Sequence, residues 1–148
     1  MAGLTTPAQT NILNLLKGTT WPTAAGAWQA TVATYYVGLF TTNPTSDAAT
    51  SNGSTEVSGN AYARQPITAS SGWSAIVSGS GTSTQISNAA VITFPAPTPA
   101  TWGNIIGVGI FDASTAGNLW LWSAITSQAI GVGVVASFAI GSLIFNLD

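Results

Sequence analysis

The apolar residues of this chain occur in short runs, and turn-forming residues close most of them. Residues 31–40 (TVATYYVGLF) are rich in β-branched and aromatic side chains, and the run ends at Thr41-Thr42-Asn43-Pro44. Further runs of the same kind cover residues 86–94, 105–111 and 119–125. The turn residues at 112–118 separate the last two runs, as in a hairpin. This pattern predicts an all-β fold, either an antiparallel β-sandwich or a jelly-roll-like domain.

A short amphipathic α-helix is predicted before the strands. Thr6 and Gln9 have the spacing of a capping box, and Pro7 stands at the first helical position. Gly18 is placed to end the helix. Its apolar face, which carries Ile12, Leu15 and Leu16, could dock on this chain's core or on a neighbouring subunit. The predicted organisation is an N-terminal helical arm over residues 1–18 and a single β-sandwich domain over residues 19–148.

Residues 129–147 form a nearly uncharged apolar run, so a transmembrane helix has to be considered. Bulky side chains alternate with small ones along the run, at Ile130, Val132, Val134, Phe138 and Ile140. After Gly141-Ser142 the phase changes, and Leu143, Phe145 and Leu147 become the bulky set. Such alternation is typical of strands, and no Lys or Arg flanks the run. We therefore expect two strands joined by a bulge or tight turn, and no membrane partner.

Charged side chains are very scarce. They make up 4% of the chain, at Lys17, Asp47, Glu56, Arg64, Asp112 and Asp148, whereas ordinary soluble domains have about 25%. Two basic residues are too few to neutralise a nucleic-acid backbone, so no nucleic-acid partner is expected. A surface so poor in charge repels its neighbours weakly and favours association. The composition therefore predicts a protein that packs against other protein.

The residues that usually carry catalysis are missing from this sequence. It contains no His and no Cys, which excludes His-based triads and Cys-based metal sites. Lys17 falls near a predicted helix end, and the Asp residues fall mainly in turns or at the terminus, where Asp is favoured for local hydrogen bonds. The glycines at 103–109 and 131–133 lack the Lys-Ser/Thr ending of a phosphate loop. We predict no enzyme activity, no cofactor and no metal site.

Six tryptophans could contribute to a binding surface: Trp21, Trp28, Trp73, Trp102, Trp120 and Trp122. Trp120 and Trp122 share a parity, so they are expected to face the same way and to fill the core. Trp21 precedes Pro22, and Trp73 lies between Gly72 and Ser74, in loop-like surroundings. Together with the helix residues Ile12, Leu15 and Leu16, Trp21 and Trp73 are the predicted protein-interface residues.

Glu56 and Arg64 flank a short Val57-Ser58-Gly59-Asn60 segment. A hairpin there would bring them together as a partly shielded ion pair that fixes the loop. The alternative is an exposed pair worth less than about 1 kcal/mol.

Several segments resemble a family of small virion proteins of tailed bacteriophages and prophages. The matching residues are 3–6, 36–45, 55–65, 88–95, 102–103, 109–113, 117–119 and 141–148. The most specific stretch is Thr55–Gln65 (TEVSGNAYARQ). The Trp-rich segment 119–122 and the apolar run 129–147 depart from the family's pattern. Members are variously described as tail-fibre-like or head-decoration proteins, and the resemblance implies no catalytic motif.

The resemblance and the composition together favour a capsid decoration, or cement, protein. Such a protein would bind the outer capsid surface of the virion and stabilise contacts between copies of the major capsid protein, as a homotrimer. The alternative is a tail-tip or fibre-associated module that recognises a host surface glycan stacked on exposed Trp. Exposed Trp beside Asn, Gln or Asp would favour the glycan, and a broad apolar patch would favour the capsid. A secreted or membrane-associated prophage protein is a third possibility, and the polar N-terminus, unlike a secretory signal, argues against it.

Overall fold

The structure is a computed structural model, and it describes residues 6–18, 21–23, 26–28, 32–44, 55–78 and 84–147. The chain divides into two compact units. The helix unit comprises the described residues within Met1–Ala33, Ile67–Val91 and Phe138–Asp148, and the sheet unit comprises those within Thr34–Pro66 and Ile92–Ser137. The predicted division into an arm (1–18) and a single domain (19–148) stays a prediction.

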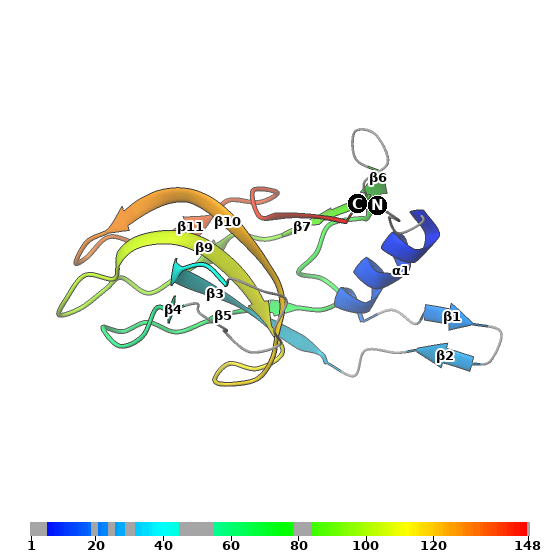
Figure 1. The fold of residues 1–148 in the computed structure, drawn as a ribbon, viewed down its shortest axis with the longest axis horizontal. Coiled ribbons are helices and arrows are strands. Elements are labelled where there is room, and N and C mark those ends of the chain that lie inside the picture. The colour runs from blue at the N-terminus through cyan, green and yellow to red at the C-terminus, as the bar shows by residue number, and fades with distance from the viewer. Residues whose placement is uncertain are drawn as a thin grey trace. The chain divides into compact units, whose positions relative to one another are not determined.

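The sheet unit is built around three antiparallel strands in which β9 lies between β3 and β10 (Figure 1). These strands are β3 (Thr34–Thr42), β9 (Gly103–Phe111) and β10 (Leu119–Ile130). Two short strands also pair with β3, namely β4 (Thr55–Glu56) and β5 (Gln65–Thr68), the latter contributing its first two residues to this unit. In addition, β8 (Ile92–Thr93) pairs with β11 (Ser137–Phe138), which crosses the boundary between the units.

Strand β10 is the edge of its sheet, and its pairing with β9 is irregular. Register shifts occur between Leu119 and Leu121 and between Ala124 and Gln128. Along β3 and β9 the central residues are buried, whereas most β10 residues are half-buried or exposed. Edge strands of natural sheets often carry such bulges, which hinder pairing with a further strand.

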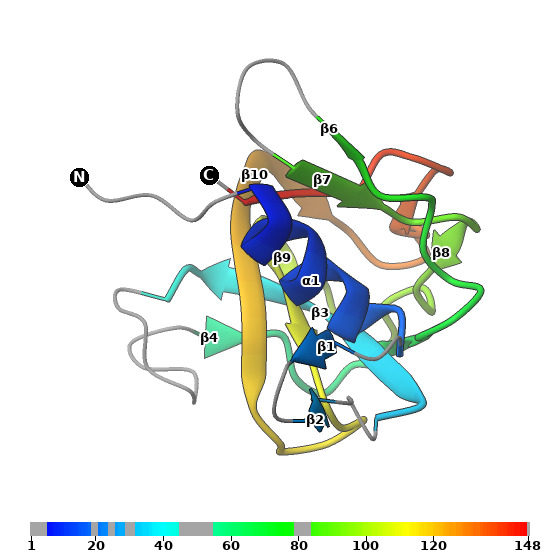
Figure 2. The same cartoon turned by 90° about the vertical axis from the view of Figure 1, so that its right-hand side faces the viewer.

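The helix unit contains α1 (Thr6–Leu16), which Figure 2 shows in dark blue, facing the viewer. The helix ends as the sequence predicts, because Gly18 adopts a φ of 67° and its N–H donates to the Leu15 carbonyl. The strands of this unit are β1 (Trp21–Thr23), β2 (Gly26–Trp28), β6 (Val77–Ser78), β7 (Thr84–Ser87) and β12 (Ile144–Leu147). Strand β7 pairs with β6 and β12, and β1 pairs with β2.

A buried asparagine holds the loops of the helix unit together. The Asn88 side chain donates to the carbonyls of Ala90 (2.7 Å) and Ala139 (2.8 Å), and it accepts from the Leu143 N–H (2.9 Å). Asn88 is fully buried and also forms a β-bridge with Trp73. These bonds end strand β7 at residue 87. The expected single strand over residues 86–94 is therefore wrong, and β7 and β8 replace it.

The predicted all-β fold with a short N-terminal α-helix is confirmed, since the registered strand pairs are antiparallel, consistent with a β-sandwich. Among the described residues, no helix is long and apolar enough to cross a membrane.

The C-terminal run contains the end of β10, then β11 and β12, so it is not the expected pair of strands. Val132, Val134 and Ile140, expected on one bulky face, are exposed. Turns at 131–134 and 139–142 break the alternation. After the second turn, Leu143 and Phe145 are buried, as the change of phase predicts.

Candidate functional site: a pinned loop and an exposed tryptophan

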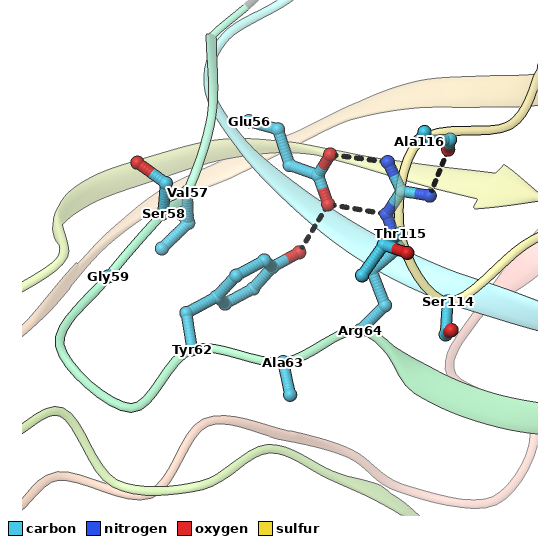
Figure 3. A pocket seen from close by; sticks show the side chains of 10 residues that line it. All are labelled: Glu56, Val57, Ser58, Gly59, Tyr62, Ala63, Arg64, Ser114, Thr115 and Ala116. Atoms are coloured by element: carbon cyan, nitrogen blue, oxygen red, sulfur yellow. Dashed lines mark hydrogen bonds and ion pairs between the residues drawn. The ribbon is translucent and has the colours of Figure 1, made fainter.

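Glu56 and Arg64 form an ion pair in the sheet unit (Figure 3). Arg64 Nε donates to Glu56 Oε1 (2.7 Å), and Arg64 Nη2 donates to Glu56 Oε2 (2.6 Å). The guanidinium also lies 3.4 Å from the centroid of the Phe111 ring. The Arg64 side chain is 7% exposed and that of Glu56 is 22% exposed. The ion pair is therefore bidentate and partly shielded from solvent, unlike a solvated surface pair.

Tyr62 completes the hydrogen bonding of the Glu56 carboxylate. Its hydroxyl donates to Glu56 Oε1 (2.9 Å) and accepts from the Leu39 N–H (2.9 Å). Burial, followed by the negative charge of Glu56, raises the pKa of Tyr62 well above its ordinary value, so the hydroxyl stays protonated and remains a donor. The ring packs edge-on against Trp102 and parallel to Phe94.

A glycine on β3 makes room for this ion pair. A Cβ at Gly38 would lie 2.7 Å from a Phe111 ring carbon and 2.9 Å from Glu56 Oε1. Any larger residue at this position would push the carboxylate or the ring aside.

Arg64 also fixes the loop of residues 112–118 between β9 and β10. Its Nη1 donates to the carbonyls of Ala113 and Ala116, both at 2.7 Å. The ends of the loop are joined separately, because Asn118 donates its backbone N–H to Asp112 Oδ1 (2.7 Å) and its amide to Oδ2 (2.8 Å). The loop is thus held both at its centre and at its ends.

An open hollow of about 430 Å³ lies beside the ion pair (Figure 3). Its lining is Glu56, Val57, Ser58, Gly59, Tyr62, Ala63, Arg64, Ser114, Thr115 and Ala116. One wall therefore comes from the segment between β4 and β5, and the other from the loop of residues 112–118, which we call the pinned loop. Among the residues that the structure describes there is no group of three or more His, Cys, Asp or Glu side chains that could hold a metal.

Trp120 stands just after the pinned loop and is 50% exposed. Its Nε1 donates to Asp112 Oδ2 (3.2 Å), and its ring meets the Tyr35 ring edge-on, with centroids 6.2 Å apart. Partial burial alone would raise the pKa of Asp112, but the hydrogen bonds from Asn118 and Trp120 hold it below its ordinary value. The indole is thus anchored by its polar edge while half of its surface stays open to solvent.

The expectation that Trp120 and Trp122 fill the core is wrong, because Trp120 is 50% and Trp122 is 39% exposed. Trp122 pairs with Gly109, whereas Trp120 has no partner in the register, because it lies within the shift between Leu119 and Leu121. Burial alternates regularly from Leu119 to Thr126, with both tryptophans on the exposed parity, so only their assignment to the core is wrong. An edge position also leaves side chains of β10 without a neighbouring strand to cover them.

The predicted interface residues are only partly accessible. Leu16 and Trp73 are each 3% exposed, and Trp73 packs edge-on against Phe145, so neither is a surface contact in this structure. Ile12 and Leu15 are half-buried. The side chain of Trp21 lies outside the described residues. Leu16 and Trp73 belong to the core of their own unit here, and the predicted interface itself stays a prediction.

Sequence reasoning missed Trp120 and its support by Asp112 and Asn118. A signal was present, since an Asp-to-Asn turn directly precedes the Trp-rich strand. The partner of Arg64 in the 112–118 loop was not visible in the sequence, because the residues are about fifty positions apart and the contacts use backbone carbonyls.

Comparison with known proteins gives one family match. A family model described as "Podophage GP4 fiber I protein gp80" matches residues 3–146. No curated protein matches the chain. The family match confirms the resemblance to tailed-phage virion proteins, and it falls on the fibre side of that resemblance rather than the head-decoration side.

Proposed function

Because the chain belongs to the family of the podophage GP4 fiber I protein gp80, we propose that it is a fibre-associated virion module that recognises a glycan on the host cell surface. The family supports a structural role in the virion, of the fibre kind. The part of the proposal that concerns a glycan rests on the structure around Trp120. This proposal gives the fibre alternative priority over capsid decoration.

The single observation that carries the proposal is the half-exposed Trp120 anchored beside Asp112 and Asn118. One face of a sugar ring presents C–H groups, which pack on the face of an indole, while its hydroxyls need carboxylate or amide partners nearby. An anchored ring loses little conformational freedom on binding, so more of the contact energy appears as affinity. Exposed Trp beside Asp and Asn is the arrangement expected of a glycan site.

Titration of the full chain with surface polysaccharide purified from a bacterium that the phage infects tests the proposal. The readout is tryptophan fluorescence together with calorimetry. Trp120→Ala should weaken binding at least about tenfold, because the stacking surface is lost. Ile140→Ala, which removes another exposed apolar side chain, is the matched control and should bind like the unaltered chain. Equal binding by Trp120→Ala and the unaltered chain would overturn the proposal.

Capsid decoration is the second candidate, and one observation favours it. Val132, Val134 and Val135 are 57%, 47% and 54% exposed in the segment after β10, so they offer an apolar surface to another protein. The copy number relative to the major capsid protein, measured by mass spectrometry of purified virions, separates the two candidates. Hundreds of copies would favour decoration of the outer capsid surface, and a few copies would favour a fibre. The predicted homotrimer is testable by light scattering of the purified chain.

A further inference from the structure

The hollow beside the ion pair and the Trp120 surface are built on the same loop. Residues 114–116 line the hollow, while Asp112, itself bonded to Asn118 at the other end of the loop, accepts a hydrogen bond from Trp120. We propose that the hollow and Trp120 are two subsites for one glycan chain, with the hollow taking an uncharged, hydroxyl-rich sugar unit. This inference rests on the proposed function and names the ligand class of a second part of the same site.

The chemistry of the hollow suits an uncharged ligand. The positive Arg64 and the negative Glu56 are joined at 2.6 Å, so neither charge is free to select an anion or a cation. The lining also includes three exposed residues with hydroxyl side chains, Ser58, Ser114 and Thr115. Hydroxyls both donate and accept hydrogen bonds, which matches the hydroxyls of a sugar.

The size and rigidity of the hollow also suit a site for a single sugar unit. Its volume of about 430 Å³ lies within the range of about 300–1,000 Å³ found for small-ligand sites. Both walls are fixed by the same guanidinium, which binds Glu56 on one side and the carbonyls of Ala113 and Ala116 on the other. A ligand would therefore not have to order either wall on binding.

The test compares a long and a short ligand. The probes are oligosaccharide fragments and component monosaccharides released from the surface polysaccharide of a bacterium that the phage infects. Ser58→Trp should fill the hollow, because Ser58 is an exposed residue of its lining. Ser70→Trp, at an exposed serine in the helix unit, is the matched control.

We expect Ser58→Trp to weaken oligosaccharide binding about tenfold while leaving monosaccharide binding on Trp120 within about twofold. Trp120→Ala should weaken both, and Ser70→Trp should weaken neither. If Ser58→Trp binds the oligosaccharide normally while Trp120→Ala does not, the hollow is no subsite and the proposed function survives. Loss of monosaccharide binding in Ser58→Trp would also overturn the two-subsite arrangement. If Trp120→Ala binds both ligands normally, the proposed function fails.

Discussion

Trp73 in the helix unit and Trp120 in the sheet unit make the same kind of aromatic contact and end in opposite environments. Each meets another ring edge-on, Trp73 with Phe145 and Trp120 with Tyr35. Trp73 is 3% exposed, and its Nε1 has no hydrogen-bond partner among the described residues. Trp120 is 50% exposed, and its Nε1 is paired with Asp112.

The difference shows that the role of a tryptophan depends on which part of it the fold satisfies. In the helix unit the apolar surface of the Trp73 ring is buried, at the cost of an unpaired indole N–H. In the sheet unit the N–H is satisfied and the apolar surface is left open. Only the second arrangement leaves a ring surface available to a ligand.

Removing the Trp73 ring should have the largest effect on stability. Trp73→Ala should lower the free energy of unfolding by about 3–5 kcal/mol, because it opens a cavity against Phe145. Trp120→Ala should lower it by less than about 1 kcal/mol, because that ring is half in solvent already. Urea unfolding of both variants measures this contrast. Equal losses of unfolding free energy would show that the two rings contribute alike to stability.

The next effect concerns the buried asparagine of the helix unit. Asn88→Ala should cost about 3 kcal/mol, because it leaves the buried Leu143 N–H without its acceptor and removes the bonds to the carbonyls of Ala90 and Ala139. Thermal unfolding gives the value. Asn118→Ala is the control, since Asn118 is an exposed loop asparagine and should cost less. A smaller loss at Asn88 than at Asn118 would contradict this account of the helix unit.

The ion pair of the sheet unit should have a smaller effect, because Glu56 keeps some contact with solvent. Arg64→Met should cost about 2 kcal/mol by leaving the carboxylate without its fork of donors and by freeing the loop at Ala113 and Ala116. Adding Glu56→Leu to Arg64→Met should recover part of the loss, since no charge then remains unpaired. Chemical denaturation of the single and double variants measures this coupling. A double variant less stable than Arg64→Met would show that the charge is not what destabilises the single variant.

The smallest effect is a pH dependence at the anchor of Trp120. The pKa of Asp112 is lowered by folding, so its contribution is present above the ordinary value of 3.8 and is lost as pH falls through the folded value. Because Asp112 is largely solvated, we expect less than about 0.5 kcal/mol. Melting temperatures measured between about pH 6 and pH 3 should fall slightly more for the unaltered chain than for Asp112→Asn. If the melting temperatures of the two proteins fall in parallel, Asp112 does not contribute to the pH dependence of stability.

Local signals in the sequence predicted the elements that local chemistry decides. Helix α1 begins at Thr6 and is ended by Gly18, and the 112–118 turn joins β9 to β10 as expected. The short segment between Glu56 and Arg64 does bring the two side chains together. In each of these cases the deciding residues lie within about ten positions of one another.

Features that depend on distant partners could not be predicted in this way. Residue 88 looks like the middle of a strand until Ala139 and Leu143, about fifty residues away, bind its side chain. Trp120 and Trp122 look like core residues, but β10 lies at the edge of the sheet and a register shift falls at Trp120. Alternation along a strand indicates which residues share a face, but it does not indicate whether that face is covered.

Tyr62 also bears on which backbone groups of the sheet stay free to pair with another chain. Its hydroxyl takes the Leu39 N–H, while the Val57 N–H takes the Leu39 carbonyl, so both backbone groups of that residue are occupied on the side of β4. A sheet with free groups there could recruit a strand from another chain, which is the first step of amyloid-like aggregation. In a chain with only 4% charged residues, charge repulsion gives little protection. At this position a phenol, in place of a further strand, satisfies the backbone N–H of Leu39 in β3.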